Sequence, residues 1–168
     1  DGKPIINLFA RSGDGKMLCV LDSNFEPYFY VITKNPIAIK EKLEKIKVEE
    51  NNESFFVARG EIIQKKFSGK DVQAIKVFTN IPAAVPVIKD VVRNWDGIDS
   101  VHEFDIPYVR RYFIDKGIIP LTLHEAKGEF ISQKSRAQMF KAESITPLST
   151  ETLHKPRILA FDIETYSP

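Results

Sequence analysis

The sequence predicts an α+β protein in which two helices cover one face of an antiparallel sheet. Between residues 27 and 105, segments with the residue types of strands and helices follow each other in the order β, α, β, β, α, β. A short turn joins the two middle strands, and each helical segment has one apolar stripe. Because a split βαβ arrangement buries both stripes in a single layer, this order indicates a ferredoxin-like core.

A β-hairpin is expected before this core, in residues 1–26. Residues 4–10 and 16–22 have strand composition, and residues 11–15 between them contain the serine, aspartate and glycines that favour a tight reversal. The single cysteine, Cys19, lies in the apolar run MLCVL. A small buried side chain is expected there rather than a nucleophile, and one thiol cannot build a disulfide framework.

The first half of the core begins with residues 27–32, PYFYVI, whose aromatic and β-branched side chains are typical of a buried strand. Asn35 and Pro36 suit the N-cap and first position of a helix. Residues 55–67 form the next strand, with alternation in their second half. The helix between them has an i, i+4, i+7 apolar stripe: Ile39, Leu43 and Ile46.

The second half of the core begins at residues 68–71, SGKD, which suit a hairpin turn into a strand over residues 72–79. A second helix starts between Pro82 and Pro86, and Pro86 is tolerable only in its first turn. Gly97 ends the helix, and residues 101–105 form a short strand. The apolar face of the helix is predicted to contain Val85, Ile88, Val91, Val92 and Trp95.

A third, short helix is predicted within residues 105–120, DIPYVRRYFIDKGIIP. Pro107 suits its first helical position and Gly117 its end. Val109, Tyr112 and Phe113 recur at helical spacing on one face, which leaves the basic side chains on the others: Arg110, Arg111 and Lys116. On residue pattern alone, an ordinary amphipathic helix with a solvated basic side is favoured over a nucleic-acid contact.

Residues 121–156 form a connector with a possible hairpin turning at residues 126–128, and residues 136–143 suit one or two helical turns. Residues 157–161, RILAF, then have the composition of a fully buried strand. Asp162 and Glu164 follow, two residues apart, so an extended backbone places both carboxylates on one side. Such a pair can bind the divalent metal ions that hold a phosphodiester and activate water.

The charge balance excludes a global basic field. Lysine and arginine number 24 against 23 aspartates and glutamates, a formal charge of +1, so a polyanionic partner requires a local patch. No apolar run has the length of a membrane span, no signal peptide is visible, and the default expectation is a cytoplasmic protein. Three histidines show no metal-ligand spacing and are expected to be surface or packing residues: His102, His124 and His154.

Five segments resemble parts of the archaeal family B DNA polymerases. FDIET after a buried strand is similar to the first motif of their proofreading 3′–5′ exonuclease, while EPYFY, KKFSGK, PAAVPVIKD and EFDIPYVRRYFIDKGIIP resemble their amino-terminal domain. The resemblance implies a template-binding, ferredoxin-like domain over residues 27–120. It also implies that residues 157–168 begin an RNase H-like exonuclease domain.

The same resemblance implies cofactors and partners. In the parent enzyme, Asp162 and Glu164 would help to bind Mg²⁺ or Mn²⁺. The remaining exonuclease carboxylates and the polymerase aspartates lie beyond residue 168, so this fragment alone is expected to be inactive and to need no cofactor. Single-stranded template DNA is the expected partner, with the primer–template duplex and a sliding clamp bound through the parent enzyme, and no membrane.

In archaeal members of the family, the amino-terminal domain captures uracil from the template ahead of the polymerase site and stalls synthesis. Apolar walls and an aromatic face suit an unstacked base, and an arginine can hold the adjacent phosphate. Because burying one methyl group distinguishes bases by only about 1–3 kcal/mol, thymine must be rejected by a close wall, for which Val85 is the candidate. By resemblance, the pocket residues are Pro27, Tyr28, Pro82, Val85, Ile106, Pro107, Tyr108 and Arg111.

Two other functions fit the same fold. Ferredoxin-like sheets include RNA-binding modules that stack bases on aromatic residues of the central strands, but the central strand DVQAIKVF lacks the glycine and aromatic pattern of that signature. The domain could also be a structural brace of the polymerase that contacts template nonspecifically. In a domain of that kind, Pro27, Tyr28 and Val85 would be ordinary core and turn residues.

Overall fold

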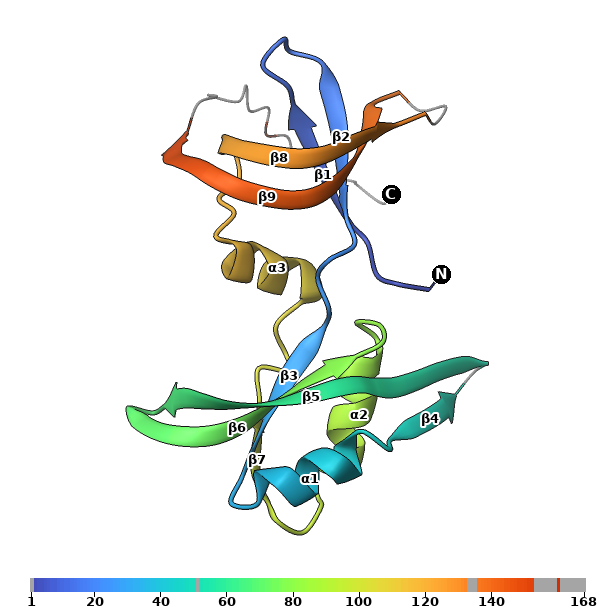
Figure 1. The fold of residues 1–168 in the computed structure, drawn as a ribbon, viewed down its shortest axis with the longest axis vertical. Coiled ribbons are helices and arrows are strands. Elements are labelled where there is room, and N and C mark those ends of the chain that lie inside the picture. The colour runs from blue at the N-terminus through green and yellow to red at the C-terminus, as the bar shows by residue number, and fades with distance from the viewer. Residues whose placement is uncertain (1, 51, 133–135, 153–159, 161–168) are drawn as a thin grey trace, which may run out of the picture.

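The computed structural model describes residues 2–50, 52–132, 136–152 and 160, and the elements in this part of the chain form two sheets (Figure 1). The strands are β1 (Ile6–Arg11), β2 (Met17–Asp22), β3 (Tyr28–Thr33), β4 (Lys47–Glu50), β5 (Glu53–Phe67), β6 (Lys70–Thr79), β7 (Ile98–His102), β8 (Thr122–Ile131) and β9 (Gln138–Thr152). The helices are α1 (Pro36–Leu43), α2 (Ala84–Val92) and α3 (Tyr108–Lys116).

The five-stranded sheet has the ferredoxin-like order that the sequence predicts. Its strands lie in the order β4-β5-β6-β3-β7, and every neighbouring pair is antiparallel. The four strands other than β4, in the order β5-β6-β3-β7, form the split βαβ arrangement together with α1 and α2. The prediction lacks β4 because residues 47–50, KVEE, are too polar to show a strand pattern. This edge strand forms by pairing with the long strand β5.

The two helices α1 and α2 enclose the main core against one face of this sheet. The side chain of Asn35 caps α1 by accepting a hydrogen bond from the backbone N–H of Ala38. Pro86 is the third residue of α2, in the first turn, where no intrahelical partner is lost. The buried core contains Phe29, Val31, Ile39, Leu43, Phe55, Val57, Ile75, Val77, Ala84, Val85, Ile88 and Val92.

Four details of this layer differ from the prediction. The helix α2 ends at Val92, so Trp95 and Gly97, expected within the helix and at its end, lie in the turn that follows. The helix α1 ends at Leu43, and Ile46 packs against the core from the turn that follows. Val91 is 40% exposed, because Val92 fills the buried position on that turn of α2. The strand β7 begins at Ile98 and ends at His102, because the positive φ of Glu103, 60°, interrupts the extended backbone.

The opposite face of the five-stranded sheet packs against α3, which lies between the two sheets in Figure 1. The face of α3 differs from the prediction. Val109 is 53% exposed, whereas Arg111, expected on the basic side, is only 6% exposed. The stripe that faces the sheet consists of the buried Arg111 and Tyr112 and the half-buried Tyr108, which have i, i+3, i+4 spacing. Pro107 is the extended N-cap rather than the first helical residue.

The second sheet joins the amino-terminal hairpin to residues 122–152 in the order β1-β2-β9-β8. The hairpin of β1 and β2 is confirmed, and Cys19 on β2 is buried as expected. In addition, β2 pairs in parallel with β9. The segment 121–156, expected to be a connector, therefore contributes two long strands to this sheet.

Two local predictions in that segment are wrong. Residues 126–128 do not turn, because β8 runs through them and the register with β9 shifts between Lys127 and Gly128. This irregularity is a bulge that uses Gly128 at φ 155°. Residues 138–143, within the expected helical turns, belong to β9, where Phe140 lies opposite Phe130.

The strand expected at residues 157–161 lies, except for residue 160, outside the described part of the chain. The segment boundaries after residues 26, 120 and 156 stay predictions. None of the helices in the described ranges is long and apolar enough to cross a membrane.

Candidate functional site

Three chain segments that are far apart in the sequence meet at the end of the five-stranded sheet where β3 begins. The backbone N–H of Thr79 donates to the carbonyl oxygen of Pro27 at 2.9 Å, which places the turn before α2 beside the start of β3. The hydroxyl of Tyr108 donates to the carbonyl oxygen of Phe25 at 2.5 Å and joins α3 to the same place. These contacts bring together the three segments from which the predicted pocket residues come.

A cavity of about 190 Å³ lies between these segments. All eight predicted residues line it, and Pro86, Phe104 and Asp105 complete the lining. The walls are mainly proline, aliphatic and aromatic side chains. Since drug-sized ligands occupy pockets of about 300–1,000 Å³, the cavity suits one small ring rather than a whole nucleotide.

Two pocket-lining side chains, Tyr28 and Arg111, belong to one hydrogen-bonded network. The Tyr28 hydroxyl donates to Asp115 at 2.5 Å and accepts from Nη1 of Arg111 at 3.2 Å. The same Nη1 is paired with the carboxylate of Glu103, and Nη2 donates to the backbone oxygen of Glu103 at 3.0 Å. The second carboxylate oxygen of Glu103 lies 2.7 Å from Nζ of Lys65 on β5.

The charges of this network are stabilised by their partners. Burial alone would lower the pKa of Arg111, but hydrogen bonding to Glu103 raises it above the ordinary value. Burial would raise the pKa of Glu103, but the hydrogen bonds from Lys65 and Arg111 lower it. Both groups are therefore charged at neutral pH, and the guanidinium beside the pocket is already neutralised by a carboxylate.

The two tyrosines of the pocket are neutral at physiological pH. Burial raises the pKa of Tyr28 far above its usual value, and hydrogen bonding to Asp115 adds to the effect. Burial, followed by the negative charges of Asp22 and Glu26, raises the pKa of Tyr108 to about 12. Their phenol groups therefore act as polar, uncharged walls.

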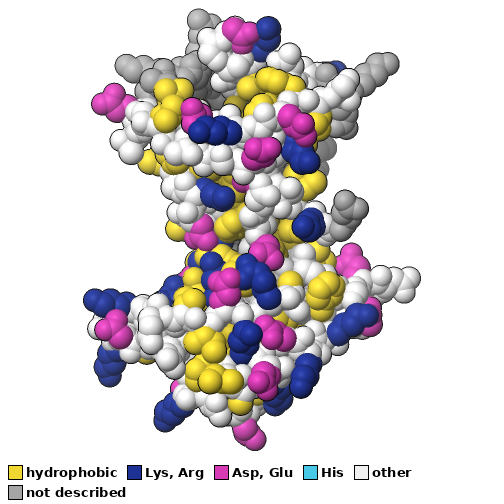
Figure 2. Space-filling view, in the orientation of Figure 1, with side chains coloured by type: hydrophobic (Ala, Val, Ile, Leu, Met, Phe, Trp, Pro, Cys, Tyr) yellow, Lys and Arg dark blue, Asp and Glu magenta, His cyan; other side chains and the backbone are white. Residues whose placement is uncertain are grey.

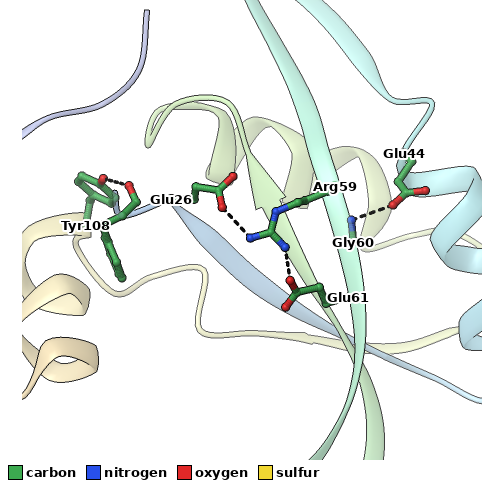
Figure 3. Close-up of polar contacts among 7 residues, drawn as sticks. Glu26, Glu44, Arg59, Gly60, Glu61 and Tyr108 are labelled. Carbon is green, nitrogen blue, oxygen red and sulfur yellow. Dashed lines mark hydrogen bonds and ion pairs between the residues drawn. The ribbon is translucent and has the colours of Figure 1, made fainter. Parts of the chain in front are cut away.

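The segment before Pro27 is anchored from β5. Arg59 lies between the carboxylates of Glu26 and Glu61, as Figure 3 shows, and its Nη2 is 2.6 Å from Glu26. The guanidinium also lies over the ring of Phe78, with 3.5 Å between its central carbon and the ring centroid. This arrangement fixes Glu26, directly next to the first pocket residue.

Figure 2 shows lysine and arginine side chains scattered among aspartates and glutamates over the five-stranded half of the visible face. No large surface of one sign is seen there. This agrees with the balanced composition, so recognition of a polyanion by this face depends on individual side chains.

The predicted metal ligands Asp162 and Glu164 lie outside the described residues. Within the described ranges, no group of three or more His, Cys, Asp or Glu side chains is arranged to hold a metal ion. His102 packs against Phe67, with 4.0 Å between ring centroids, and contacts Ser100. His124 contacts the backbone oxygen of Thr122. His154 is not among the described residues.

Sequence reasoning missed the two acidic members of the network, Glu103 and Asp115. Both lie within the segment EFDIPYVRRYFIDKGIIP, so the resemblance includes them. By residue pattern alone, however, an acidic side chain in or next to a basic helix is typical of an ordinary surface residue. The spacing of eight residues between Glu103 and Arg111 does not place them on one helix face, because a loop separates them. Only the tertiary contact identifies the pair.

A family model for the exonuclease domain of DNA polymerase family B matches residues 99–168. Three curated relatives are DNA polymerases. That of Thermococcus kodakarensis is 40% identical over 121 residues, covering 72% of this chain and 7% of the relative. That of Thermococcus gorgonarius is 38% identical over 121 residues, covering 72% and 15%. That of Pyrococcus horikoshii is 35% identical over 125 residues, covering 74% and 10%.

A solved structure has the same fold. The family B DNA polymerase from the hyperthermophilic archaeon Pyrobaculum calidifontis superimposes with a TM-score of 0.74, at 22% sequence identity, over 88% of this chain and 19% of that chain. The fold of this chain therefore recurs within that polymerase.

Proposed function

The chain belongs to the family B DNA polymerases, as an amino-terminal region of the archaeal type, and on that premise we propose that it binds single-stranded template DNA and captures uracil in the pocket at the start of β3. The chain spans 7% to 15% of the length of the curated relatives described above. For the complete enzyme we propose DNA-directed polymerisation with 3′–5′ proofreading. Its exonuclease metals would be Mg²⁺ or Mn²⁺, with Asp162 and Glu164 as ligands, and its partners a primer–template duplex and a sliding clamp.

One observation carries the proposal: the eight residues assigned by resemblance, from three separate segments, line a single small cavity. Tyr28 and Val85 also belong to the buried cores, but core packing alone does not require all eight residues to share one concave surface. The apolar walls, with two neutral tyrosines, match an uncharged base taken out of its stack better than they match a charged ligand.

Selection against thymine would come from Val85. This side chain belongs to the first turn of α2, where the backbone N–H donates to the Pro82 carbonyl at 3.2 Å, and it is also part of the main core. Because other core residues pack against Val85, its side chain cannot move away to admit the extra methyl group of thymine. A tightly packed core resists added volume. Rigid exclusion adds to the limited discrimination that burial of one methyl group can supply.

Arg111 remains the proposed contact for the phosphate next to the bound base. Its guanidinium is shared with Glu103, so a phosphate at this position would bind an ion pair rather than a free cation. We therefore expect this contact to orient the strand and to contribute little to nonspecific affinity.

A specific observation argues against the RNA-binding alternative. The rings of Tyr28 and Tyr30 on the sheet face are only 6% and 7% exposed. Lys76 lies over the first ring at 3.8 Å from its centroid, and Lys65 over the second at 3.9 Å. Bases cannot stack on these rings unless the lysines move, whereas RNA-recognition sheets present open aromatic faces.

The structural brace is favoured by a different observation. On the four-stranded sheet, Phe9 and Phe130 are 76% and 64% exposed. Exposed aromatic side chains are available for contact with another protein surface, such as a neighbouring domain. Bracing and uracil capture involve different parts of the molecule, so the two functions are compatible.

The test is fluorescence anisotropy with a single-stranded DNA that contains one uracil, compared with the same strand containing thymine, at two salt concentrations. We expect a preference for uracil of about tenfold or more, and Val85→Gln should abolish it by occupying the cavity. The matched control is Val91→Gln, a substitution on the exposed side of the same helix, which should leave the preference unchanged.

Equal, weak and strongly salt-dependent binding to both strands by the wild-type protein would contradict uracil capture and leave the brace as the function. A preference that survives Val85→Gln would place the base-binding site elsewhere in the molecule.

A further inference from the structure

We propose that Glu103 is the positioning residue of this pocket: it fixes Arg111, and through Arg111 the hydroxyl of Tyr28, in the arrangement that receives the base. The inference rests on the proposed function of the pocket. Glu103 does not line the cavity, so its action is indirect.

Glu103 contacts Arg111 twice. Its carboxylate pairs with Nη1 of the guanidinium, and its backbone oxygen accepts from Nη2 at 3.0 Å. Two contacts from one residue fix the plane of the guanidinium as well as its position, because the donors of arginine have a rigid fork geometry. Lys65 on β5 holds the other carboxylate oxygen of Glu103 at 2.7 Å and ties this residue to the sheet.

The backbone of Glu103 supports the same conclusion. Its φ of 60° lies in the left-handed region, which residues other than glycine adopt infrequently. With this backbone, both its side chain and its carbonyl oxygen reach Arg111. Strained conformations of this kind persist where surrounding contacts determine them, and they concentrate at functional sites.

The effect reaches the pocket through Tyr28. Its hydroxyl lies between Nη1 of Arg111, at 3.2 Å, and Asp115, at 2.5 Å. The guanidinium also lies 4.7 Å from the centroid of the Tyr28 ring. Without the Glu103 carboxylate, the buried guanidinium would keep the backbone oxygen of residue 103 and the Tyr28 hydroxyl as partners, but no charge that neutralises it, and would move towards solvent or Asp115. Either movement displaces the tyrosine wall.

Glu103 also sets the charge beside the cavity. One carboxylate neutralises two cations, Lys65 and Arg111, from two different elements. Removal of this single charge would therefore release cations for phosphate while disturbing the site that recognises the base. Removal of this charge should therefore weaken the specific binding of uracil without weakening the nonspecific binding of DNA. A general loss of protein stability would weaken both.

The experiment uses Glu103→Gln in the anisotropy assay with the uracil and thymine strands. In metal sites, replacing an outer residue that orients a ligand lowers affinity by about 10- to 100-fold, and by analogy we expect the preference for uracil to fall by about tenfold. Binding of the thymine strand should be unchanged or tighter. The plot of its log binding constant against log salt concentration should become steeper, by about 0.7 for each cation that gains a phosphate contact. Asp14→Asn is the control, because it removes one carboxylate from an exposed ion pair with Lys16, in the turn between β1 and β2, and should leave the preference unchanged.

A double-mutant cycle shows whether the effect passes through Arg111. In an Arg111→Gln background, Glu103→Gln should cause no further loss of preference, because the group that it positions is absent. If Glu103→Gln alone does not fold, the double variant, which leaves no unpaired buried guanidinium, supplies the comparison with Arg111→Gln. A further loss in the double variant overturns the proposed route.

A readout without DNA separates this inference from the proposed function. With ¹³Cζ-labelled tyrosine, the NMR resonance of Tyr28 should shift in Glu103→Gln and stay in place in Asp14→Asn. If the wild-type protein shows no preference for uracil, the proposed function fails while this measurement still tests the positioning of Tyr28. An unchanged Tyr28 resonance in a folded Glu103→Gln protein overturns the inference.

Discussion

The hydroxyl of Tyr112 donates a hydrogen bond of 2.8 Å to the carboxylate of Asp22, and both side chains are buried. Tyr112 lies on α3, and Asp22 is the last residue of β2, so this contact joins the helix of the pocket to the four-stranded sheet. The same carboxylate accepts from the backbone N–H of Asn24 at 2.8 Å, in the segment that leads to the pocket residues Pro27 and Tyr28.

Tyr112→Phe should lower the free energy of unfolding by about 1–3 kcal/mol, because it leaves a buried carboxylate oxygen without its donor. Urea denaturation followed by circular dichroism measures the change. Tyr108→Phe is the comparison, since its hydroxyl bonds to a neutral carbonyl oxygen, and it should cost about 0.5–1.5 kcal/mol. A larger loss for Tyr108→Phe than for Tyr112→Phe would contradict this ranking.

The two sides of α2 should respond differently to truncation. Ile88 is fully buried in the main core, and Ile88→Ala should cost about 2–5 kcal/mol through lost burial and the cavity that remains. Val91→Ala on the exposed side should stay within about 0.5 kcal/mol of the wild type. Urea midpoints of the two variants measure the difference, and equal losses would place Val91 in the core after all.

Gly128 should not tolerate a side chain. A Cβ atom at this position would collide with the backbone oxygen of Lys141 on the neighbouring strand, and the φ of 155° favours glycine. Gly128→Ala should therefore destabilise the protein by about 1–3 kcal/mol, as measured by urea denaturation. Gly13→Ala, at a turn position with open space around it, is the matched control and should have little effect. A wild-type midpoint for Gly128→Ala would show that the bulge can shift freely.

Stability should fall in alkaline solution above about pH 10. Burial raises the pKa of Tyr28, Tyr108 and Tyr112 in the folded state, to about 12 for Tyr108, whereas the ordinary value is 10.0. Their contribution is therefore complete below pH 10 and is lost as the pH rises through the folded-state pKa values, because the unfolded chain releases these protons first.

Urea denaturation at pH 8, 10 and 11 measures this dependence. Each buried tyrosine contributes a slope of up to about 1.4 kcal/mol per pH unit above pH 10. Tyr112→Phe removes one such group, so its stability should decline less steeply than that of the wild type. Parallel slopes for the two proteins would show that Tyr112 does not titrate in this way.

Much of the ferredoxin-like layer could be predicted because its signals are local. Asn35 and Pro36 mark the start of α1 by capping geometry, and the turn at Ser68 and Gly69 joins two strands that are adjacent in sequence. The candidate pocket could be assigned because the resemblance names residues at the ends of these elements. These residues come together around one cavity once the strands of the sheet are placed in the ferredoxin-like order.

The faces of α3 could not be assigned in the same way. Its sequence has apolar residues on more than one side, so spacing alone favoured Val109 for burial and Arg111 for solvent. The tertiary structure reverses both, because Glu103 and Tyr28 provide partners for a buried guanidinium. A buried charge needs such partners, and they come from other elements.

The sequence by itself determined the order of strands and helices in the core, their caps and turns, and the family resemblance, since these depend on periodicity and on residues that are close along the chain. Only the tertiary structure decided that β2 pairs in parallel with β9, where Leu18 faces Gln138, and that Glu103 holds Arg111 beside the pocket. Contacts between distant residues follow from the packing of complete elements, and a local pattern does not specify which distant partner a strand edge or a charged side chain will meet.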